Sequence, residues 1–311
     1  MPMHASWADA NRAVALLRAV LDLDTNDDVR IESAPGPNRN AVFRIVTPRP
    51  VFLKLYRPGS PADAGSAEAT ASSALGHVLP VPDVIAHGVR EGDNIPYLIT
   101  EARPGDTLEA ALRKAAPGTI RPVLSQLLGG LRRVARSAEV RSALSALSSE
   151  LIGAHARDFC PLAWLRQHAP ATAALFDGFG SITHRPVLGS LSSNNILADQ
   201  SSGTLSLSAY IDFEGARIGP TGFDHAMFWY DLLLQGRADL ADEWLRNVLR
   251  SAEAELVSGM LVNAAWLSTM RTCLRHPEQQ LASNLAPIVL DALEDAVVQA
   301  RFAARPPADL G

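Results

Sequence analysis

Three polar residues have the types and the chain order that binding a phosphate group together with a divalent cation would require. Lys54 stands inside the apolar segment Val51–Tyr56, whose composition predicts a β-strand. Asp212 directly follows the apolar segment Ala209–Ile211, and a carboxylate at that place can bind Mg²⁺, which prefers oxygen ligands. Asn195 precedes Asp212 in the chain and could supply a second ligand oxygen. Taken singly, each residue also fits an ordinary strand or turn position; together they indicate a phosphate and metal site.

The lysine is notable because lysine is rare in this chain. Of the 28 basic residues, only Lys54 and Lys114 are lysines. A strand lysine can reach the phosphates of a nucleotide, or it can simply occupy the solvent side of a half-buried strand. A phosphate-binding lysine needs a carboxylate to orient it, and Glu68, on a helix predicted at residues 63–77, is the first glutamate downstream. Glu68 alone would be interpreted as a surface charge; paired with Lys54 it predicts a nucleotide site.

A turn rich in glycine, proline and asparagine, residues 35–40, precedes the strand predicted at Ala41–Val46. Such a turn usually does no more than reverse the chain. It could also lie over phosphate groups and donate backbone N–H groups to them. Asn40, at its end, is therefore a candidate nucleotide-binding residue.

The surrounding pattern predicts an α+β chain with two lobes. Residues 1–101 would form a small lobe with a mixed β-sheet, and residues 102–311 a larger, mainly helical lobe. In the first lobe we expect helices at 6–23 and 63–77 and strands at 41–46, 51–56, 84–88 and 97–101. In the second lobe, Asp106 and Glu109 have the spacing of a capping box for a helix ending at Lys114. Further along we expect a mostly helical region to Phe176 with loops near 117–118 and 158–161, extended segments at 187–189, 196–198 and 205–211, and helices at 224–235, 238–252, 254–274 and 285–303.

Composition excludes several classes of function. The chain has 311 residues, of which 47% are hydrophobic and 20% charged, as in soluble globular proteins. A net charge of -5 argues against nucleic-acid binding. No apolar run is long enough for a membrane span, and the N-terminal segment has an amphipathic pattern unlike a secretory signal, so we expect a cytoplasmic protein. Two distant cysteines, Cys160 and Cys273, provide neither a disulfide framework nor a zinc site.

The order of the motifs resembles the aminoglycoside phosphotransferase family, whose members have a kinase-like fold. The resemblance spans roughly residues 30–235. It rests on the strand lysine, the helix glutamate, a segment at 97–105 that resembles an interlobe hinge, the sequence Ile-Asp-Phe-Glu at 211–214 and the sequence Phe-Asp-His-Ala at 223–226. It implies a bilobal protein-kinase-like fold, ATP (or GTP) and Mg²⁺ as cofactors, and a small-molecule or peptide acceptor.

The resemblance also implies roles for individual residues. Lys54 would hold nucleotide phosphates and Glu68 would pair with it. Glu101 and Ala102 would form the hinge that contacts the base of the nucleotide. Asn195 and Asp212 would bind Mg²⁺, and Asp224 would be structural and brace the catalytic loop.

The catalytic loop itself departs from the family pattern His-Gly-Asp-x-x-x-x-Asn. In Leu188–Asn195, Gly189 and Asn195 match, but Leu188 replaces the histidine and Ser190 replaces the catalytic aspartate. A serine hydroxyl cannot act as a base at neutral pH, and a positioned general base typically contributes about 10²–10⁴ in rate. Positioning and charge stabilisation supply most of the catalysis of phosphoryl transfer, so a slow enzyme is physically feasible.

The sequence therefore leaves three hypotheses. The chain is a phosphotransferase with an atypical catalytic loop, a pseudokinase that binds nucleotide as a scaffold or partner subunit, or a remnant that binds no nucleotide. The intact Lys54, Asn195 and Asp212 argue against the third. Replacement bases near in sequence are His184, Asp199, Glu214 and His225. Four acidic residues could form a wall for a cationic sugar, but their helical positions favour ordinary solvated faces: Asp231, Asp239, Asp242 and Glu243.

Overall fold

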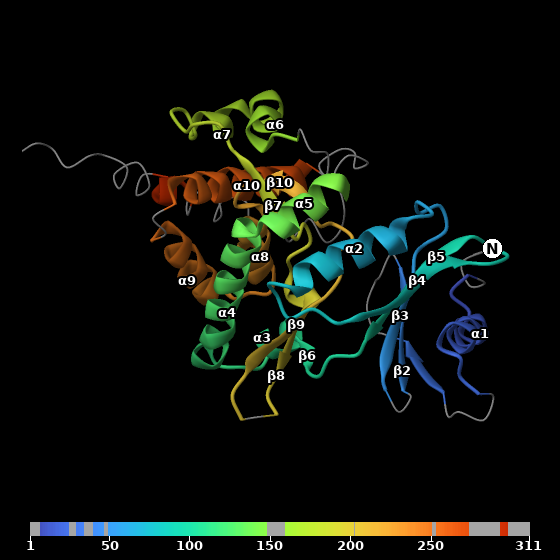
Figure 1. Ribbon diagram of the computed structural model, residues 1–311. Coiled ribbons are helices and arrows are strands. Elements are labelled where there is room, and N and C mark those ends of the chain that lie inside the picture. Colours follow the sequence, from blue (N-terminus) through green and yellow to red (C-terminus); the bar gives the residue numbers. More distant parts are fainter. Residues whose placement is uncertain are drawn as a thin grey trace, which may run out of the picture. The chain divides into compact units, whose positions relative to one another are not determined.

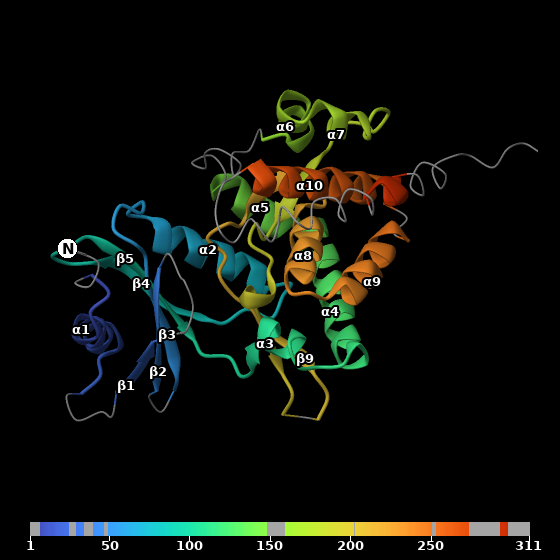
Figure 2. The ribbon, with the colours of Figure 1, turned by 180° about the vertical axis from the view of Figure 1, so that it is seen from behind.

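The computed structural model describes residues 7–24, 29–33, 40–46, 49–147, 159–201, 203–250, 253–273 and 293–297. The chain forms two compact units (Figures 1 and 2). The first comprises the residues up to Gly105 together with Ser208–Glu214, and the second comprises Asp106–Leu207 and the chain from Gly215 onward. This division differs from the expected lobes of residues 1–101 and 102–311 because the segment carrying Asp212 folds with the first unit. Within that unit, the Tyr210 N–H group donates a hydrogen bond to the Pro80 carbonyl oxygen at 2.9 Å.

The first unit is built on a five-stranded sheet with the order β1-β2-β3-β5-β4, in which every neighbouring pair is antiparallel. Two helices, α1 and α2, lie on opposite faces of this sheet (Figures 1 and 2). The elements are α1 (Ala10–Leu21), β1 (Arg30–Ser33), β2 (Ala41–Val46), β3 (Val51–Leu55), α2 (Ala64–Gly76), β4 (Val84–Arg90) and β5 (Ile95–Glu101). The strands and helices predicted for this lobe are confirmed with shifted ends, and β1 is an additional strand that the sequence analysis did not predict.

The alternation of β3 decides where its lysine points. Val51, Leu53 and Leu55 are buried in the core that the sheet forms with α1. Successive side chains of a strand point to opposite faces, so Lys54 lies on the face that carries α2. In the register of the sheet it is paired with Leu98 of β5, and Leu98 packs in the apolar cluster that includes Ala69 of α2.

Helix α2 approaches the sheet closely at Gly65. A Cβ atom added there would lie 2.3 Å from the Tyr97 carbonyl oxygen on β5, a distance that non-bonded atoms do not tolerate. Glycine therefore lets the helix lie directly on the strand. One turn further along, Glu68 is buried, with only 3% of its surface exposed, on the same side of the sheet as Lys54.

The second unit is mainly helical and contains short strands. Strands β7 and β10 form an antiparallel pair, and β6 pairs with β8. The elements are β6 (Asp106–Thr107), α3 (Leu108–Leu112), α4 (Pro117–Arg136), α5 (Ala138–Leu147), α6 (Pro161–His168), α7 (Pro170–Ala174), β7 (His184–Val187), a 3₁₀ turn η3 (Ser193–Asn195), β8 (Ile196–Asp199), β10 (Arg217–Pro220), α8 (Phe223–Leu234), α9 (Ala238–Leu249) and α10 (Ala254–Cys273). Strand β9 (Ser206–Tyr210) is divided between the units, because the first unit begins again at Ser208. Among the described helices, none combines the length and the apolar character needed to cross a membrane.

Three local predictions for the second unit are wrong. Asp106 does not cap a helix, because it pairs with Ala198 in strand β6; the cap is Thr107, whose hydroxyl oxygen accepts the Ala110 N–H. Residues 117–118 form the first turn of α4 rather than a loop, since proline at a first helical position sacrifices no hydrogen bond. An extended segment is expected at 187–189, but strand β7 covers His184–Val187 and ends where the expected segment begins. The predicted helix at 285–303 lies outside the described residues except for 293–297, which are helical.

Helices α8 and α10 touch through glycines, and this contact fixes the start of α8. Gly222 has a φ angle of 81°, and a Cβ atom there would lie 2.3 Å from the Met260 backbone nitrogen. A Cβ on Gly259 would lie 2.1 Å from the Thr221 carbonyl oxygen. The first turn of α8, which carries Asp224 and His225, is thereby held in the interior of the second unit, where both side chains are buried.

Candidate active site

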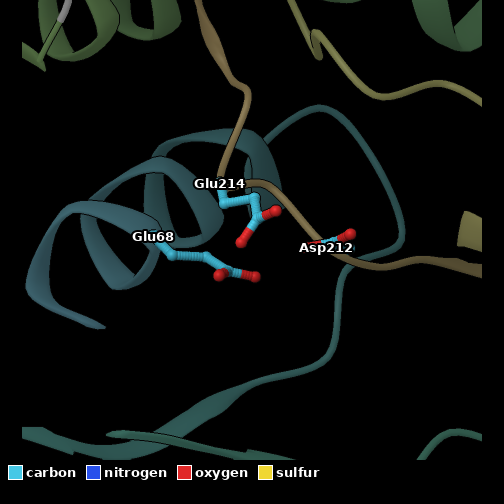
Figure 3. Close-up of side chains that lie close together, drawn as sticks. All are labelled: Glu68, Asp212 and Glu214. Atoms are coloured by element: carbon cyan, nitrogen blue, oxygen red, sulfur yellow. The ribbon is translucent and has the colours of Figure 1, made fainter. Parts of the chain in front are cut away.

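The ammonium group of Lys54 lies among three carboxylate groups, all within the first compact unit. Its Nζ atom is 2.7 Å from Glu68 Oε2, 2.6 Å from Asp212 Oδ1 and 3.4 Å from Glu214 Oε2. Glu68 extends from helix α2, whereas Asp212 and Glu214 belong to one segment that follows β9, and the three side chains lie close together (Figure 3). The structure therefore brings together Lys54, Glu68 and Asp212, as the sequence analysis expected, and adds Glu214.

Electrostatics fix the charge of this lysine. Burial by itself would lower the pKa of Lys54, but the carboxylates of Glu68, Asp212 and Glu214 more than offset burial and raise the pKa well above its ordinary value. Burial also raises the pKa of Glu68, against the opposing effect of the Lys54 charge. Three carboxylates surround one ammonium group, so the cluster attracts a further cation.

Glu68 is held in place by contacts to both of its oxygen atoms. The Tyr56 hydroxyl and the Lys54 ammonium donate to Oε2, and the Phe213 N–H group donates to Oε1 at 3.1 Å. A carboxylate with both oxygens engaged is suited to orient Lys54 rather than to bind a metal. Sequence reasoning assigned no role to Tyr56, although a signal existed: Tyr56 stands two residues after Lys54, a spacing that puts both side chains on one face of a strand.

Asn40 holds Glu214 in the structure. Its Nδ2 group donates to Glu214 Oε2 at 2.8 Å, while its Oδ1 atom accepts the Arg57 N–H at 3.1 Å. Glu214 is thus restrained by Asn40 and by the Lys54 ion pair. A role for Asn40 in nucleotide binding stays a prediction; its side chain is positioned here to set the direction of a carboxylate.

Asp212 adopts a backbone conformation that is uncommon for a residue with a side chain. Its φ angle is 65°, in the left-handed region, which costs residues other than glycine about 1–2 kcal/mol, with aspartate and asparagine the most tolerant. This turn directs the Asp212 carboxylate to Lys54 and the next backbone N–H, that of Phe213, to Glu68. Local strain that is maintained by specific contacts is typical of functional sites.

The expected hinge residues use their backbone N–H groups within the first unit. The Glu101 N–H donates to the Asp83 carbonyl oxygen and the Ala102 N–H to the Pro50 carbonyl oxygen, each at 2.9 Å. Neither N–H is available to a bound base in this structure. The assignment of Glu101 and Ala102 to nucleotide binding stays a prediction that depends on other atoms of the segment.

In the second unit, Asp224 braces the loop that carries Ser190. Its carboxylate accepts the Leu188 N–H at 2.7 Å and the Gly189 N–H at 2.9 Å, which confirms its expected structural role. Burial raises the pKa of Asp224 to about 6, although these two hydrogen bonds and Arg217 act in the opposite direction. Gly189 has a φ angle of 77°, and a Cβ atom there would lie 1.8 Å from the Gly215 carbonyl oxygen, so only glycine fits.

The remainder of this loop is also ordered by hydrogen bonds. Asn195 Nδ2 donates to the Ser190 carbonyl oxygen at 2.9 Å, and the Ser193 N–H donates to Asp231 Oδ2 at 2.8 Å. The helical position of Asp231 predicts a solvated face, and this prediction is wrong, because the side chain is half-buried against the loop. The loop thus keeps a defined geometry although Ser190 offers no carboxylate.

Each candidate replacement base in the second unit is engaged or buried elsewhere. His184 Nε2 is 3.3 Å from the Phe159 carbonyl oxygen. The Asp199 carboxylate accepts hydrogen bonds from the backbone N–H and the hydroxyl of Ser201. His225 is buried, and burial, together with the charge of Arg132, lowers its pKa to about 4. The geometry favours none of the three as a general base in place of the aspartate that Ser190 replaces.

A known protein family accounts for most of the chain. The model of the phosphotransferase enzyme family, APH, matches residues 30–260. The chain belongs to the APH family. The match includes Lys54, the loop 188–195 and Asp212, while a search of curated proteins found no match.

Solved structures share the fold of this APH-family protein. The GDP complex of an aminoglycoside 2'-phosphotransferase-IIIa aligns with a TM-score of 0.64 at 17% identity, covering 92% of this chain and 99% of that one. A putative aminoglycoside phosphotransferase from Ralstonia eutropha gives 0.61 at 14% identity, covering 94% and 98%. APH(3'')-Id from Streptomyces rimosus with ADP and streptomycin gives 0.51 at 16% identity, covering 92% and 99%. At these identities the likeness establishes the fold, and it confirms the predicted α+β kinase-like class with a small sheet lobe and a larger helical lobe.

Proposed function

We propose that this APH-family protein binds ATP or GTP together with Mg²⁺ and transfers the γ-phosphoryl group to a hydroxyl group of a small molecule or peptide. The observation that carries the proposal is the pairing of the Lys54 ammonium with both Glu68 and Asp212. Solved proteins of the same fold in complex with GDP and with ADP support a nucleotide as the ligand.

The donor set fits a divalent cation. Carboxylate oxygens of Glu68, Asp212 and Glu214 lie within 4.8 Å of one another, and oxygen ligands of this kind suit Mg²⁺. We assign the ion to Asp212 and, from the family motif, to Asn195, with Glu68 reserved for Lys54. These two residues, Asp212 and Asn195, would hold Mg²⁺, which would supply positive charge to offset the negative charge that develops during transfer.

Lys54 would bind phosphate by exchanging one partner. Its contact with Asp212 gives way to phosphate oxygens, while its contact with Glu68 remains because Tyr56 and the Phe213 N–H fix that carboxylate. The raised pKa keeps the ammonium group charged throughout. Lys54 therefore supplies a permanent positive charge, and Glu68 orients the lysine side chain.

The transfer step has to proceed without a carboxylate at residue 190. The acceptor oxygen bonds to the γ-phosphorus, the bond from that phosphorus to the bridging β-phosphate oxygen breaks, and the hydroxyl proton passes to a phosphoryl oxygen instead of to the protein. Because the transition state is loose, the acceptor oxygen forms little of its bond to phosphorus in it, and the hydroxyl group does not have to lose its proton before transfer. We expect a slow enzyme, with a transfer rate about 10²–10⁴-fold lower than that of an enzyme with a positioned general base.

One observation favours a second candidate function, a pseudokinase that binds nucleotide without transferring phosphate. Leu188, at the histidine position of the family motif, is 3% exposed and offers no polar group. Asp224 and Asn195 nevertheless hold the loop in an ordered form. An ordered loop that lacks the catalytic side chains is expected in a pseudokinase that binds nucleotide.

A γ-phosphoryl transfer assay with Mg·ATP separates the two functions. We expect slow release or transfer of the γ-phosphoryl group by the wild type, none by Asp212→Asn, and an increase with Ser190→Asp. Asparagine is the matched blank because it tolerates the left-handed backbone at this position. Nucleotide binding with no turnover in the wild type, even over long incubation, would favour the pseudokinase; turnover that survives Asp212→Asn would contradict the site assignment.

A further inference from the structure

A pocket in the second unit lies between the C-terminal half of α4, strand β7 and the N-terminus of α8. Its polar lining is dominated by guanidinium groups: Arg132 and Arg136 come from α4, and Arg185 comes from β7. Glu253, before α10, also lines it. No function described above uses this pocket.

A buried histidine contributes an unsatisfied polar atom to the same pocket. His225 lines it and is 7% exposed. Among the described residues, its Nε2 atom has no hydrogen-bond partner. Buried polar groups nearly always have a partner, so this nitrogen calls for a ligand that can hydrogen-bond to it. The charge of Arg132 lowers the pKa of this imidazole and the charge of Glu253 raises it. His225 therefore interacts electrostatically with two other residues of the pocket.

Not every arginine of the pocket is paired with a carboxylate among the described residues. Arg136 donates to Glu253 at 2.8 Å, and Arg185 donates to Glu253 at 3.1 Å and to Glu255 at 2.9 Å. Arg132 has no carboxylate partner within the described part of the chain. Two carboxylates line the pocket, those of Glu253 and Asp224, and Asp224 accepts the Leu188 and Gly189 N–H groups. Among the described residues, Arg132 is therefore the lining guanidinium group that an anion could pair with without displacing a carboxylate.

The start of α8 adds a second feature that can attract an anion. Gly222 precedes the helix as its N-cap and provides no side-chain cap, and both Thr221 and Gly222 line the pocket. The first backbone N–H groups of a helix lack partners within the helix, and together with the helix dipole they attract anions. Here that feature coincides with an arginine and a buried imidazole nitrogen that both lack a partner in the part of the chain that the structure describes.

We propose that this pocket binds a phosphate group, carried either by inorganic phosphate or by a small phosphate monoester. Arg132, which has no carboxylate partner among the described residues, provides the first guanidinium group and Arg136 the second, and His225 Nε2 is the buried donor. Glu253 competes with the ligand, because it already occupies two of the arginines with an internal carboxylate.

The pocket is physically linked to the catalytic-loop region. Val187 lines it and directly precedes Leu188, and Asp224 lines it while accepting the Leu188 and Gly189 N–H groups. A bound phosphate therefore acts on residues that fix this loop. We expect its binding to perturb the backbone amide signals of Leu188 and Gly189 as well as the imidazole of His225.

The test uses the full chain with Lys54→Met, so that phosphate binding at the candidate nucleotide site does not contribute. Sodium phosphate and glycerol phosphate are titrated separately at constant ionic strength while NMR follows the His225 imidazole nitrogens. We expect a saturable shift and a higher His225 pKa when the pocket is occupied, because a phosphate anion favours the imidazolium form. A response to both compounds indicates that the pocket recognises the phosphate group alone; a response only to glycerol phosphate identifies the monoester as the ligand.

Matched variants decide whether the response belongs to this pocket. Arg132→Gln should weaken the affinity by about tenfold or more, as expected for losing a charge-assisted hydrogen bond. Arg133→Gln, at the next exposed position of α4 outside the pocket lining, should leave the affinity unchanged. Glu253→Gln should bind more tightly because the competing carboxylate is gone, a gain that an unfolded variant could not produce. A non-saturable response, or equal effects of the Arg132 and Arg133 variants, would overturn the proposal.

Discussion

The Lys54 ammonium and the Asp212 carboxylate form an ion pair with 2.6 Å between Nζ and Oδ1, although 158 residues separate them in the chain. The pair is possible because the segment 208–214 folds with the five-stranded sheet rather than with the helical unit. Lys54 is directed by the alternation of β3, and Asp212 by its left-handed backbone. This relationship underlies the proposed nucleotide site.

Replacing Tyr56 with phenylalanine tests whether Glu68 depends on its hydroxyl donor. Tyr56→Phe removes the hydrogen bond to Glu68 Oε2 within a buried region, so we expect a loss of about 1–3 kcal/mol in the free energy of unfolding. Nucleotide affinity should fall as Lys54 loses its fixed partner. Denaturant unfolding and calorimetry measure the two effects. Tyr97→Phe, on β5 of the same sheet, serves as the comparison, and equal effects of the two changes would contradict a special role for Tyr56.

Two glycines with similar backbone conformations separate backbone strain from steric conflict. Gly189 and Gly178 have φ angles of 77° and 90°, but only Gly189 has neighbours that a Cβ would strike. Gly178→Ala should destabilise by about 1–2 kcal/mol through the backbone alone. Gly189→Ala should cost clearly more, because the Gly215 carbonyl would have to move. Thermal unfolding of both variants measures the difference; equal losses would mean that the loop 188–195 does not pack as described.

Asp224 predicts a specific pH dependence of stability. Its pKa is raised from 3.8 to about 6 in the folded protein, so the folded state holds the proton more tightly than the unfolded state. Stability associated with Asp224 is therefore full below about pH 4 and is lost as the pH rises to about 6, amounting to roughly 3 kcal/mol. His225, whose pKa is lowered to about 4, acts in the opposite direction, so the comparison has to isolate Asp224.

Asp224→Asn provides that comparison because the amide does not titrate. Denaturant unfolding at several pH values from 4 to 7 gives the free energy of unfolding of both proteins. As the pH rises, the wild type should lose stability relative to the variant. A difference that is flat over this range would mean that Asp224 ionises normally in the folded protein.

Freeing Glu214 should alter the proposed metal site without removing a ligand that we assign to it. Asn40→Ala deletes the amide that donates to Glu214 Oε2, so Glu214 becomes free to turn toward Lys54 or toward a bound cation. We expect the dependence of nucleotide binding on Mg²⁺ concentration to shift by several-fold while the fold remains intact. Titrating Mg²⁺ at fixed ATP measures the shift, and an unchanged Mg²⁺ dependence would argue against any contribution of Glu214 to cation binding.

Apart from β1, the strands and helices of the first lobe could be predicted from local patterns, whereas the kinase-like fold class was predicted from the order of the motifs, which resembles a known family. Lys54 could be paired with Glu68 because a phosphate-binding lysine needs a carboxylate and Glu68 is the first glutamate downstream, on a predicted helix. The contact between Asp231 and Ser193 was missed, although Asp231 stands two helical turns after Asp224 and so on the same face of α8. The unit boundary and the left-handed Asp212 were beyond reach, since both depend on tertiary contacts that no local pattern encodes.

Isothermal titration calorimetry with ATP, in the presence and absence of Mg²⁺, measures whether Lys54 and Asp212 form a nucleotide site. We expect saturable Mg-dependent binding by the wild type and a loss of at least about tenfold in affinity for Lys54→Met and for Asp212→Asn. Lys114→Met, which alters the other lysine of the chain, on the surface, should leave the affinity unchanged. A wild-type protein that binds no nucleotide under these conditions, or one whose affinity is indifferent to the Lys54 and Asp212 changes, would contradict the assignment of this site.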